Sequence, residues 1–309
     1  MSTALILSDE KPGHLNQSVA LASMMKWDTH IVPVHFKHSA AKSASYLLDR
    51  LQLYTPALLT PLSALSKPDV IISTGSATFY ANQLLAKRWR IPNIAILYPR
   101  GYRLDFHHIF CPAYDNPPNQ SNITALPINL SYADATWYRQ QAETFQQHHH
   151  KTEKESVGIV IGGNSRRASI QPDQLKAQLT EIFERTPEQE HWLTTSRRTP
   201  PSIIALLKTF PFDYQLIWHE GAYNPLPAFI ESCQHLFITA DSASMMSEAV
   251  SHGNAAVTTL PVLYRAPDDK LQRFVNQLEA AGCVTSLQNA STRTNKKINL
   301  QPLIEKALG

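Results

Sequence analysis

The sequence predicts an α/β protein built around mostly parallel β-sheets. Short apolar runs recur along the chain, longer mixed segments separate them, and polar turns mark their ends. Strands that alternate with helices are typical of βαβ units, in which consecutive strands lie parallel. Because the alternation continues through both halves of the 309 residues, we expect two domains of similar architecture.

Apolar runs place the strands and helices of the first half. Leu15, Val19, Ala22 and Met25 recur at helical spacing, which predicts a helix over residues 15–25. A second helix is expected at 78–88. The strands predicted for this half fall at residues 4–7, 31–34, 70–73, 94–97 and 109–111.

A polar stretch near the middle of the chain sets the domain boundary. Residues 140–155 lack apolar periodicity, which indicates an exposed helix end followed by a linker. We therefore expect one domain at 1–150 and another at 151–309, with the last helix packing back on the first domain. The strands predicted for the second half fall at residues 156–161, 191–194, 216–218, 236–239 and 255–258.

Composition narrows the classes of partner. The net charge of +3 is too small to argue for nucleic acid, although Lys87, Arg88 and Arg90 would suit an anionic membrane surface or an acidic substrate. No apolar run is long enough to span a bilayer, and the start does not resemble a signal peptide. Three scattered cysteines support neither a disulfide framework nor a zinc site, so a cytoplasmic protein without bound metal is expected.

The loop after the first strand is the first candidate site. It opens a helix, and His14 can take a proton from an acceptor hydroxyl, because imidazole titrates near physiological pH. Asp9 or Glu10 either orients this histidine or acts as the base instead. The alternative is a helix-start histidine that binds only water. Residues expected to contact substrate here are Gly13, which permits a tight turn, and its polar neighbours Asn16 and Gln17.

Two later loops of the first half give weaker indications. Gly75 follows a buried strand and suits close contact with a ligand or with the opposing domain. Arg100 is a candidate for holding an anionic group. Asp115 either lines the same site or caps a turn before Pro117.

Post-strand loops of the second half carry phosphate-compatible groups. Gly162 and Gly163 are expected to expose backbone donors, although two glycines do not make a P-loop or a dinucleotide fingerprint. Adjacent arginines point in different directions, so at most one of Arg197 and Arg198 is expected to reach a ligand. The other side chains expected to bind substrate in these loops are Asn164, Arg166, Ser196 and Asn224.

The segment 237–248 indicates a strand end, a polar turn and a helix start. Asp241, Ser242 and Ser244 supply capping oxygens, and unpaired backbone N–H groups at such a start can hold a phosphate. Met245 lies in the same turn. Glu248 follows about one and a half turns on, where a carboxylate can accept hydrogen bonds from a ribose diol. An ordinary capped junction with a solvated glutamate is the alternative.

In these residues the chain resembles the mitochondrial-fission ELM-like family of glycosyltransferases, whose bacterial members are linked to surface-glycan synthesis. The resemblance implies a GT-B fold, in which two Rossmann-like domains with mostly parallel sheets face a central cleft. The acceptor would lie mainly on the first domain and the nucleotide sugar on the second. The residues that carry the resemblance are Asp9–Gln17, Tyr98–Arg100, Asp115, Gly162–Gly163, Arg166–Arg167, Ser196–Pro200, Asn224–Pro225 and Thr239–Glu248.

More distantly, the layout is similar to the bacterial transferase that adds N-acetylglucosamine to a peptidoglycan lipid intermediate. This likeness would place His14 near the acceptor, Gly163 near the diphosphate and Glu248 on the ribose. The first loop departs from that pattern in having a single glycine, Gly13.

The resulting hypothesis is a metal-independent transferase without a cofactor. It would move a sugar from a nucleotide-diphosphate sugar, in particular a UDP-sugar, to a lipid-linked or cell-envelope glycan such as lipopolysaccharide. The enzyme would be cytoplasmic, with peripheral contact at the inner membrane. A nucleotide-sugar 2-epimerase of the same fold and a non-catalytic adaptor are the alternatives.

Overall fold

A computed structural model describes residues 2–61, 66–131, 134–149, 152–221, 223–289 and 295–309. The chain divides into two compact units. Unit 1 comprises Met1–Ala133 together with Asn299–Gly309, and unit 2 comprises Asp134–Ile298. The boundary between them thus lies before the polar stretch at 140–155, whereas the sequence analysis set it near residue 150.

Unit 1 is built on a six-stranded parallel sheet of order β2-β1-β3-β4-β5-β6. The strand order reverses between β1 and β3, so the carboxyl ends of these two strands flank a topological switch point. The strands are β1 (Thr3–Ser8), β2 (Asp28–Pro33), β3 (Val70–Thr74), β4 (Asn93–Ile96), β5 (His108–Pro112) and β6 (Ile123–Leu126).

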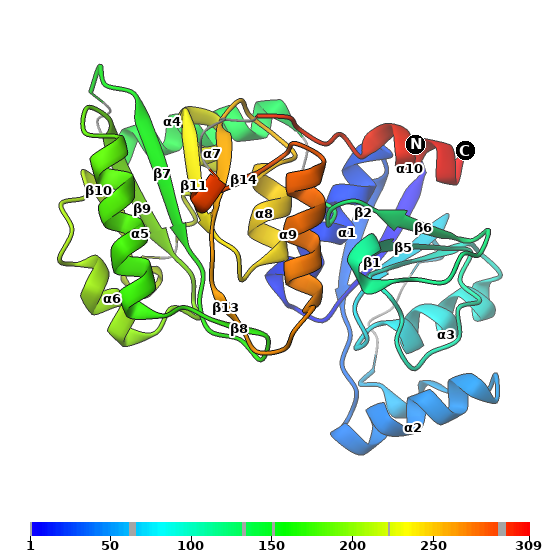
Figure 1. Ribbon diagram of the computed structural model, residues 1–309. Helices are drawn as coiled ribbons and strands as arrows, with labels where there is room; N and C mark the ends of the chain where they lie inside the picture. The colour runs from blue at the N-terminus through cyan, green and yellow to red at the C-terminus, as the bar shows by residue number, and fades with distance from the viewer. Residues whose placement is uncertain (1, 62–65, 132–133, 150–151, 222, 290–294) are drawn as a thin grey trace. The chain divides into compact units, whose positions relative to one another are not determined.

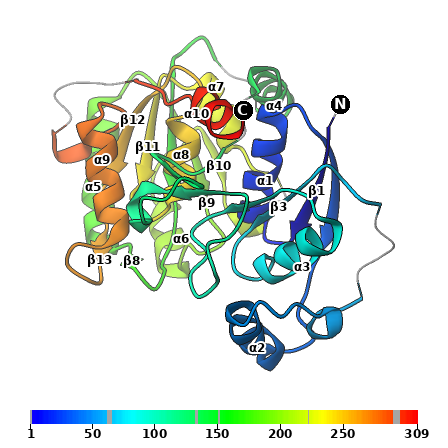
Figure 2. The same ribbon diagram turned by 90° about the vertical axis from the view of Figure 1, so that its right-hand side faces the viewer.

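Helices cover both faces of this sheet. Helix α1 packs on one face, against β1, β2 and β3, and α3 packs on the other, against β3 and β4, whereas α2 contacts α3 and stands apart from the sheet in Figure 2. The strands β3, β4 and β5 are buried along their whole length, which explains the run of three apolar residues that each contains. The helices of unit 1 are α1 (Pro12–Met24), α2 (Ser39–Arg50), α3 (Phe79–Trp89) and the C-terminal α10 (Gln301–Leu308).

Unit 2 repeats the plan with a parallel sheet of order β10-β9-β7-β11-β12-β14 (Figure 1). Its switch point lies between β7 and β11. A short antiparallel pair, β8 (Ala168–Ser169) with β13 (Leu263–Tyr264), stands apart from the sheet. The strands of the sheet are β7 (Ser156–Ile161), β9 (Glu190–Thr195), β10 (Tyr214–Leu216), β11 (His235–Thr239), β12 (Ala256–Leu260) and β14 (Thr285–Ser286).

In the part of the chain that the structure describes, unit 2 has six helices, of which α4 precedes the sheet and the other five connect its strands. They are α4 (Ala135–His148), α5 (Pro172–Arg185), α6 (Pro201–Leu207), α7 (Leu226–Ser232), α8 (Ala243–Ala249) and α9 (Lys270–Ala280). Asp269 caps α9 by accepting a hydrogen bond from the Leu271 N–H at 2.8 Å.

The predicted fold class is confirmed, one local expectation is wrong, and another is wrong in part. The strand expected at 216–218 ends at Leu216, and a 3-10 turn occupies Trp218–Glu220. The helix end expected within 140–155 is present, since α4 ends at His148, but it is not exposed throughout, because α4 buries Tyr138, Ala142 and Phe145 at helical spacing. Within the stretch only Phe145 is large and apolar, so the sequence shows no clear helical period of apolar residues there. Residues 150 and 151 lie outside the described residues.

Two further observations bear on the class of protein. All three cysteines are buried. Among the described residues, no helix combines the length and the apolar character needed to cross a bilayer.

Candidate functional site

The loop at the switch point of unit 1 joins a histidine to a carboxylate. Asp9 follows β1 directly, and His14 lies in the first turn of α1, so a five-residue separation brings the two side chains together. His14 Nδ1 lies 3.0 Å from both carboxylate oxygens of Asp9. With the proton on Nδ1, the ring donates to Asp9 and leaves Nε2 as the acceptor. Among the described residues, no group is hydrogen-bonded to that Nε2.

Asp9 is held as an anion. Its side chain is only 4% exposed, and burial alone would raise its pKa. The Lys11 ammonium, 2.6 Å from Oδ2, and the neighbouring His14 outweigh this effect and hold the pKa of Asp9 below its usual range. A fixed, charged carboxylate on Nδ1 orients the imidazole, as a general base requires.

Gly75 provides the surface against which the His14 ring lies. It follows β3, on the other side of the switch point, and has a positive φ of +86°. A Cβ atom at this position would lie 2.6 Å from His14 Cε1. The close contact expected of Gly75 is therefore made with the candidate base, inside unit 1.

The other predicted residues of this loop do not join the pair. Glu10 points to solvent and pairs with His35 at 3.0 Å, so Asp9 rather than Glu10 orients the histidine. Gly13 lies within α1 and has no atom near the position of an added Cβ, so the tight turn expected of it is absent. Gln17 is buried and donates to the Gly13 carbonyl, whereas Asn16 is exposed.

A second loop of unit 1 carries the predicted Arg100. Its guanidinium is exposed and lies 3.2 Å from an oxygen of Asp115, so the two candidates form an ion pair. The chain enters this loop through Leu97, whose φ of +72° is unfavourable for a leucine. This strained residue follows β4 directly and sets the path of the loop. The loop begins next to Gly75, because the Gly75 N–H donates to the Ile96 carbonyl at 3.3 Å.

In unit 2, the backbone N–H groups of the glycine loop after β7 are hydrogen-bonded within the protein. The Gly162 N–H donates to Thr239 Oγ1 at 2.7 Å, and the Gly163 N–H donates to Asp241 Oδ2 at 2.9 Å. The expectation that both glycines offer free backbone donors is therefore wrong. A Cβ on Gly162 would collide with the Asp241 carboxylate, and one on Gly163 with the backbone of Arg198. The glycines are needed because three post-strand loops meet here.

Asp241 is the centre of this contact. Its side chain is fully buried, accepts from Thr239 Oγ1 at 2.7 Å, and pairs with Arg198 at 3.0 Å. Burial raises the pKa of Asp241, although Gly163, Thr239 and Arg198 all favour the charged form. Asp241 is thus not a cap of α8, contrary to expectation, and its carboxylate holds three loops together.

The arginines of these loops divide into two groups. Arg198 also donates to the Gly163 carbonyl at 3.2 Å, and Arg167 pairs with Asp269 at 2.9 Å. Arg166 and Arg197 are exposed, and no hydrogen bond or ion pair holds their side chains among the described residues. The two latter guanidinium groups are the ones available to an anionic ligand.

Nearby polar residues mainly shape these loops. Asn164 accepts from the Ile170 N–H, Ser196 accepts from the Arg198 N–H, and Asn224 accepts from the Leu226 N–H. Thr199, which the sequence analysis did not single out, donates to the Gly162 carbonyl at 2.6 Å. A threonine three residues after a Ser at a strand end is the only local signal for this role.

The helix start at α8 is capped as predicted, by Ser242, which accepts from the Met245 N–H at 3.5 Å. Ser244 is exposed and Met245 half-buried. Glu248 is half-buried in the last turn of the seven-residue helix, and no described residue hydrogen-bonds to its carboxylate. Burial raises the pKa of Glu248 to about 7.

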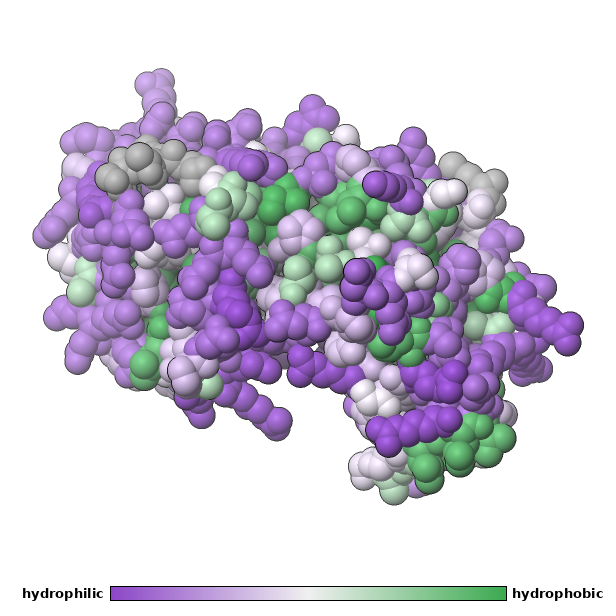
Figure 3. Space-filling model, turned by 45° about the vertical axis from the view of Figure 1, so that its right-hand side comes forward, coloured by the Kyte–Doolittle hydropathy of each residue, from purple (hydrophilic) through white to green (hydrophobic). Residues whose placement is uncertain are grey.

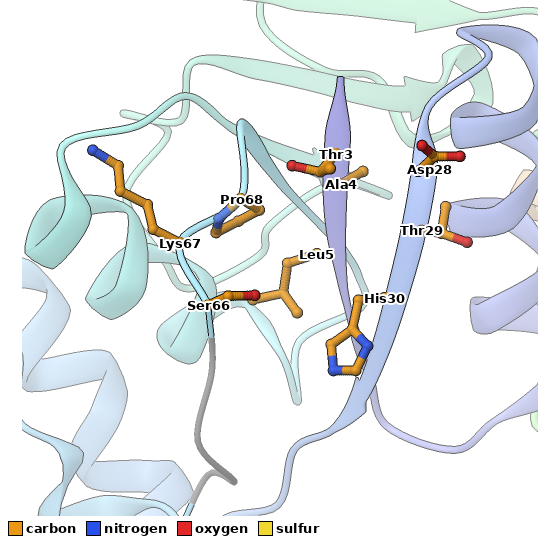
Figure 4. A pocket seen from close by; sticks show the side chains of 9 residues that line it. All are labelled: Thr3, Ala4, Leu5, Asp28, Thr29, His30, Ser66, Lys67 and Pro68. Carbon is orange, nitrogen blue, oxygen red and sulfur yellow. The ribbon is translucent and has the colours of Figure 1, made fainter. Parts of the chain in front are cut away.

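Two further features lie apart from these loops. A cavity of about 320 Å³ opens at the amino ends of β1 and β2, the opposite edge of the sheet from Asp9 (Figure 4). Its lining includes Thr3, Asp28, His30 and Lys67 and none of the candidate residues. Among the described residues, no group of three or more His, Cys, Asp or Glu side chains is placed to hold a metal ion.

Comparison with solved structures identifies the fold. UDP-GlcNAc 2-epimerase from Neisseria meningitidis, solved with UDP-GlcNAc, superposes with a TM-score of 0.52 at 14% identity, covering 94% of this chain and 89% of that one. A structure assigned to UDP-N-acetylglucosamine 2-epimerase from Listeria monocytogenes gives 0.53 at 12% identity, covering 99% and 87%. Both are GT-B proteins, so this chain has the GT-B fold, which glycosyltransferases and these epimerases share.

Sequence comparison supplies the family. An uncharacterized protein of Rickettsia prowazekii (strain Madrid E) is 24% identical, covering 97% of this chain and 94% of the relative. The family described as mitochondrial fission ELM1 matches residues 12–307, which confirms the resemblance found in the sequence. Because this match spans nearly the whole chain, the protein belongs to the mitochondrial fission ELM1 family.

Proposed function

We propose that this protein is a glycosyltransferase that moves a sugar from a nucleotide-diphosphate sugar, in particular a UDP-sugar, to a hydroxyl of an acceptor. One observation carries the proposal. At the switch point of unit 1, where α/β sheets bind ligands, Asp9 holds His14 with Nε2 unbonded on a ring that is 27% exposed. A GT-B protein with such an oriented base has the group that activates an acceptor hydroxyl.

The proposed step begins with proton transfer to His14. Nε2 takes the proton of the acceptor hydroxyl, and the oxygen of that hydroxyl bonds to the anomeric carbon of the sugar. The bond from that carbon to the diphosphate oxygen breaks, and the diphosphate leaves with the electron pair. Asp9 stabilises the imidazolium that forms. No metal ion takes part in the proposed step.

We assign the donor to unit 2. Arg166 and Arg197 would hold the diphosphate, because their guanidinium groups are exposed and unpaired, and positive charge stabilises the departing anion. Glu248 would accept hydrogen bonds from the ribose diol, because its carboxylate has no hydrogen-bond partner among the described residues. We assign no ligand to Arg198 or Asp241, since each is bonded within the loops.

The acceptor that we propose is a lipid-linked or cell-envelope glycan at the inner face of the inner membrane. This part of the proposal is supported by the resemblance of the chain to the surface-glycan branch of its family.

A screen of nucleotides tests the proposal first. UDP, CMP, GDP and ADP are added to the purified chain, and we expect UDP to raise the melting temperature most. Glu248→Ala should weaken UDP binding in calorimetry by about 1–3 kcal/mol. No thermal shift with any nucleotide would indicate the adaptor alternative. Conversion of a UDP-sugar without any acceptor would indicate the epimerase.

Replacing the base tests the catalytic step. We expect His14→Gln to lower turnover by about 10²–10⁴-fold and to leave the affinity for UDP unchanged, because unit 2 binds the nucleotide. Asp9→Asn should lower turnover as well. His107→Gln, at an exposed histidine of the same unit, is the matched control. Full activity of the His14→Gln protein would refute the assigned base.

A further inference from the structure

Helix α2 packs with its polar side inward. Ala41, Ser45 and Asp49 are spaced four residues apart, and all three are buried. Asp49 accepts from the Tyr54 hydroxyl and from the Arg103 N–H, both at 2.7 Å. A surface helix normally buries mainly apolar residues, whereas α2 buries Ser45 and Asp49 as well as packing Leu48 against the core.

Three leucines of α2 and of the segment after it point to solvent, whereas Leu48 of α2 packs against the core of unit 1. Leu47 is 62% exposed, Leu51 57% and Leu53 56%. Leu47 and Leu51 are one helical turn apart and therefore share a face. Figure 3 shows hydrophobic side chains gathered on the part of unit 1 that α2 forms. We call Leu47, Leu51 and Leu53 the leucine face.

The helix does not need these leucines for its own attachment. Ser45 Oγ lies 2.8 Å from the Tyr102 hydroxyl, and the rings of Tyr46 and Tyr102 have centroids 4.5 Å apart. Gly101 lets Tyr46 approach, because an added Cβ would lie 2.9 Å from its ring. Contacts on the inner side thus hold α2, and the leucine face stays uncovered by the described residues.

The segment that carries the leucine face has more basic than acidic side chains. Residues 35–61 contain three basic side chains, Lys37, Lys42 and Arg50, and a single acidic one, Asp49. Asp49 is buried, whereas Arg50 is exposed in the last turn of α2 beside Leu47 and Leu51. Exposed leucines beside an exposed arginine fit the surface of an anionic lipid bilayer, where acyl chains bury the leucines and headgroups attract the cation.

We propose that the leucine face is the surface by which this protein docks on an anionic membrane. The inference deepens the proposed function and rests on it in one respect, the delivery of a lipid-linked acceptor to His14. Lys42 of the same helix donates to Ser76 Oγ at 3.1 Å, and Ser76 follows Gly75, against which His14 lies. Docking through α2 would therefore hold the candidate base close to lipid headgroups.

Vesicle sedimentation tests the docking without any donor or acceptor. The full chain is mixed with vesicles of phosphatidylcholine alone or of equal parts phosphatidylcholine and phosphatidylglycerol. We expect binding to the anionic vesicles, weakened about tenfold or more in the double variant Leu47→Ser/Leu51→Ser. Arg50→Gln should weaken binding and its dependence on salt. The matched controls, exposed in unit 2, are Leu263→Ser and Lys176→Gln.

The outcomes separate the docking from other uses of the face. Equal binding by the double variant and the unchanged chain would overturn the proposal. So would a dimer that the double variant abolishes in sedimentation velocity, since the face would then bind a second copy. Absence of vesicle binding with a monomeric chain would also overturn it. Because UDP binding is measured separately, failure of docking and failure of the transferase assignment are distinguishable.

Discussion

The two switch points of this protein use similar residues in opposite ways. Between β1 and β3, an acid and a glycine hold a histidine whose Nε2 has no bonded partner in the described chain. Between β7 and β11, an acid bonds to a glycine N–H and to an arginine, and a neighbouring glycine N–H bonds to a threonine. The first arrangement leaves a reactive atom exposed, and the second fixes the shape of three loops.

This difference shows that a polar loop after a strand is not by itself a ligand site. Each donor and acceptor must first be checked against the neighbouring loops, because buried polar groups require partners. In unit 2 the check removes Gly162, Gly163 and Asp241 from the free groups and leaves Arg166 and Arg197. Three substitutions test this difference between the two units.

Asp241→Ala should have the largest effect, on stability. It removes the partner of a buried N–H at Gly163 and of the Arg198 guanidinium, so we expect a loss of about 3–5 kcal/mol in the free energy of unfolding. Urea denaturation measures it. Asp268→Ala, at a side chain that is 77% exposed in its ion pair, should change stability by about 1 kcal/mol or less. Equal losses would mean that Asp241 does not hold the loops.

Gly75→Ala should impair the base with a smaller loss of stability. The added Cβ meets the His14 ring, and alanine is unfavourable at a φ of +86°, so we expect about 1–3 kcal/mol of destabilisation and a fall in turnover. Gly13→Ala is the matched control, because its Cβ would meet no atom within 4 Å in a helical position. It should be neutral or stabilise the chain by about 0.5–1 kcal/mol. A Gly75→Ala enzyme with full turnover would show that the ring position is unimportant.

Glu248→Gln should alter the pH dependence of stability. The pKa of Glu248 is raised from 4.5 to about 7 in the folded chain, so its contribution is fully present below pH 4.5 and lost as the pH rises through about 7. Glutamine does not titrate. The variant should therefore gain stability relative to the unchanged chain between about pH 5 and pH 8, by about 2 kcal/mol after allowance for partial exposure.

Melting curves across this pH range give the measurement, with Glu184→Gln on the exposed side of α5 as control. A constant difference between the Glu248→Gln protein and the unchanged chain would contradict the raised pKa.

Much of the fold could be predicted from the sequence, because fully buried parallel strands have continuous apolar runs. Runs such as those of β3 and β7 fixed the alternation of strands and helices. Helix α2 could not be predicted in the same way, since its buried positions are Ala41, Ser45 and Asp49 and Leu47 lies outside. The helix α4 was underestimated because Ala142 is a weak apolar signal.

The candidate site was predicted in part. The five-residue separation of Asp9 and His14 made their contact foreseeable, since both lie in one loop and helix start. The contact of His14 with Gly75 joins residues from two loops, and that of Gly163 with Asp241 spans 78 positions. No local pattern marks such pairs.

The sequence by itself determined the α/β class, the family and the loops in which chemistry is to be sought. These follow from residue types and from their spacing along the chain, which are local properties. Only the tertiary structure decided which polar atoms remain unbonded and which side of α2 meets solvent. A hydrogen bond depends on which loops the sheet order brings together, so the same residue types leave His14 available in unit 1 and enclose Asp241 in unit 2.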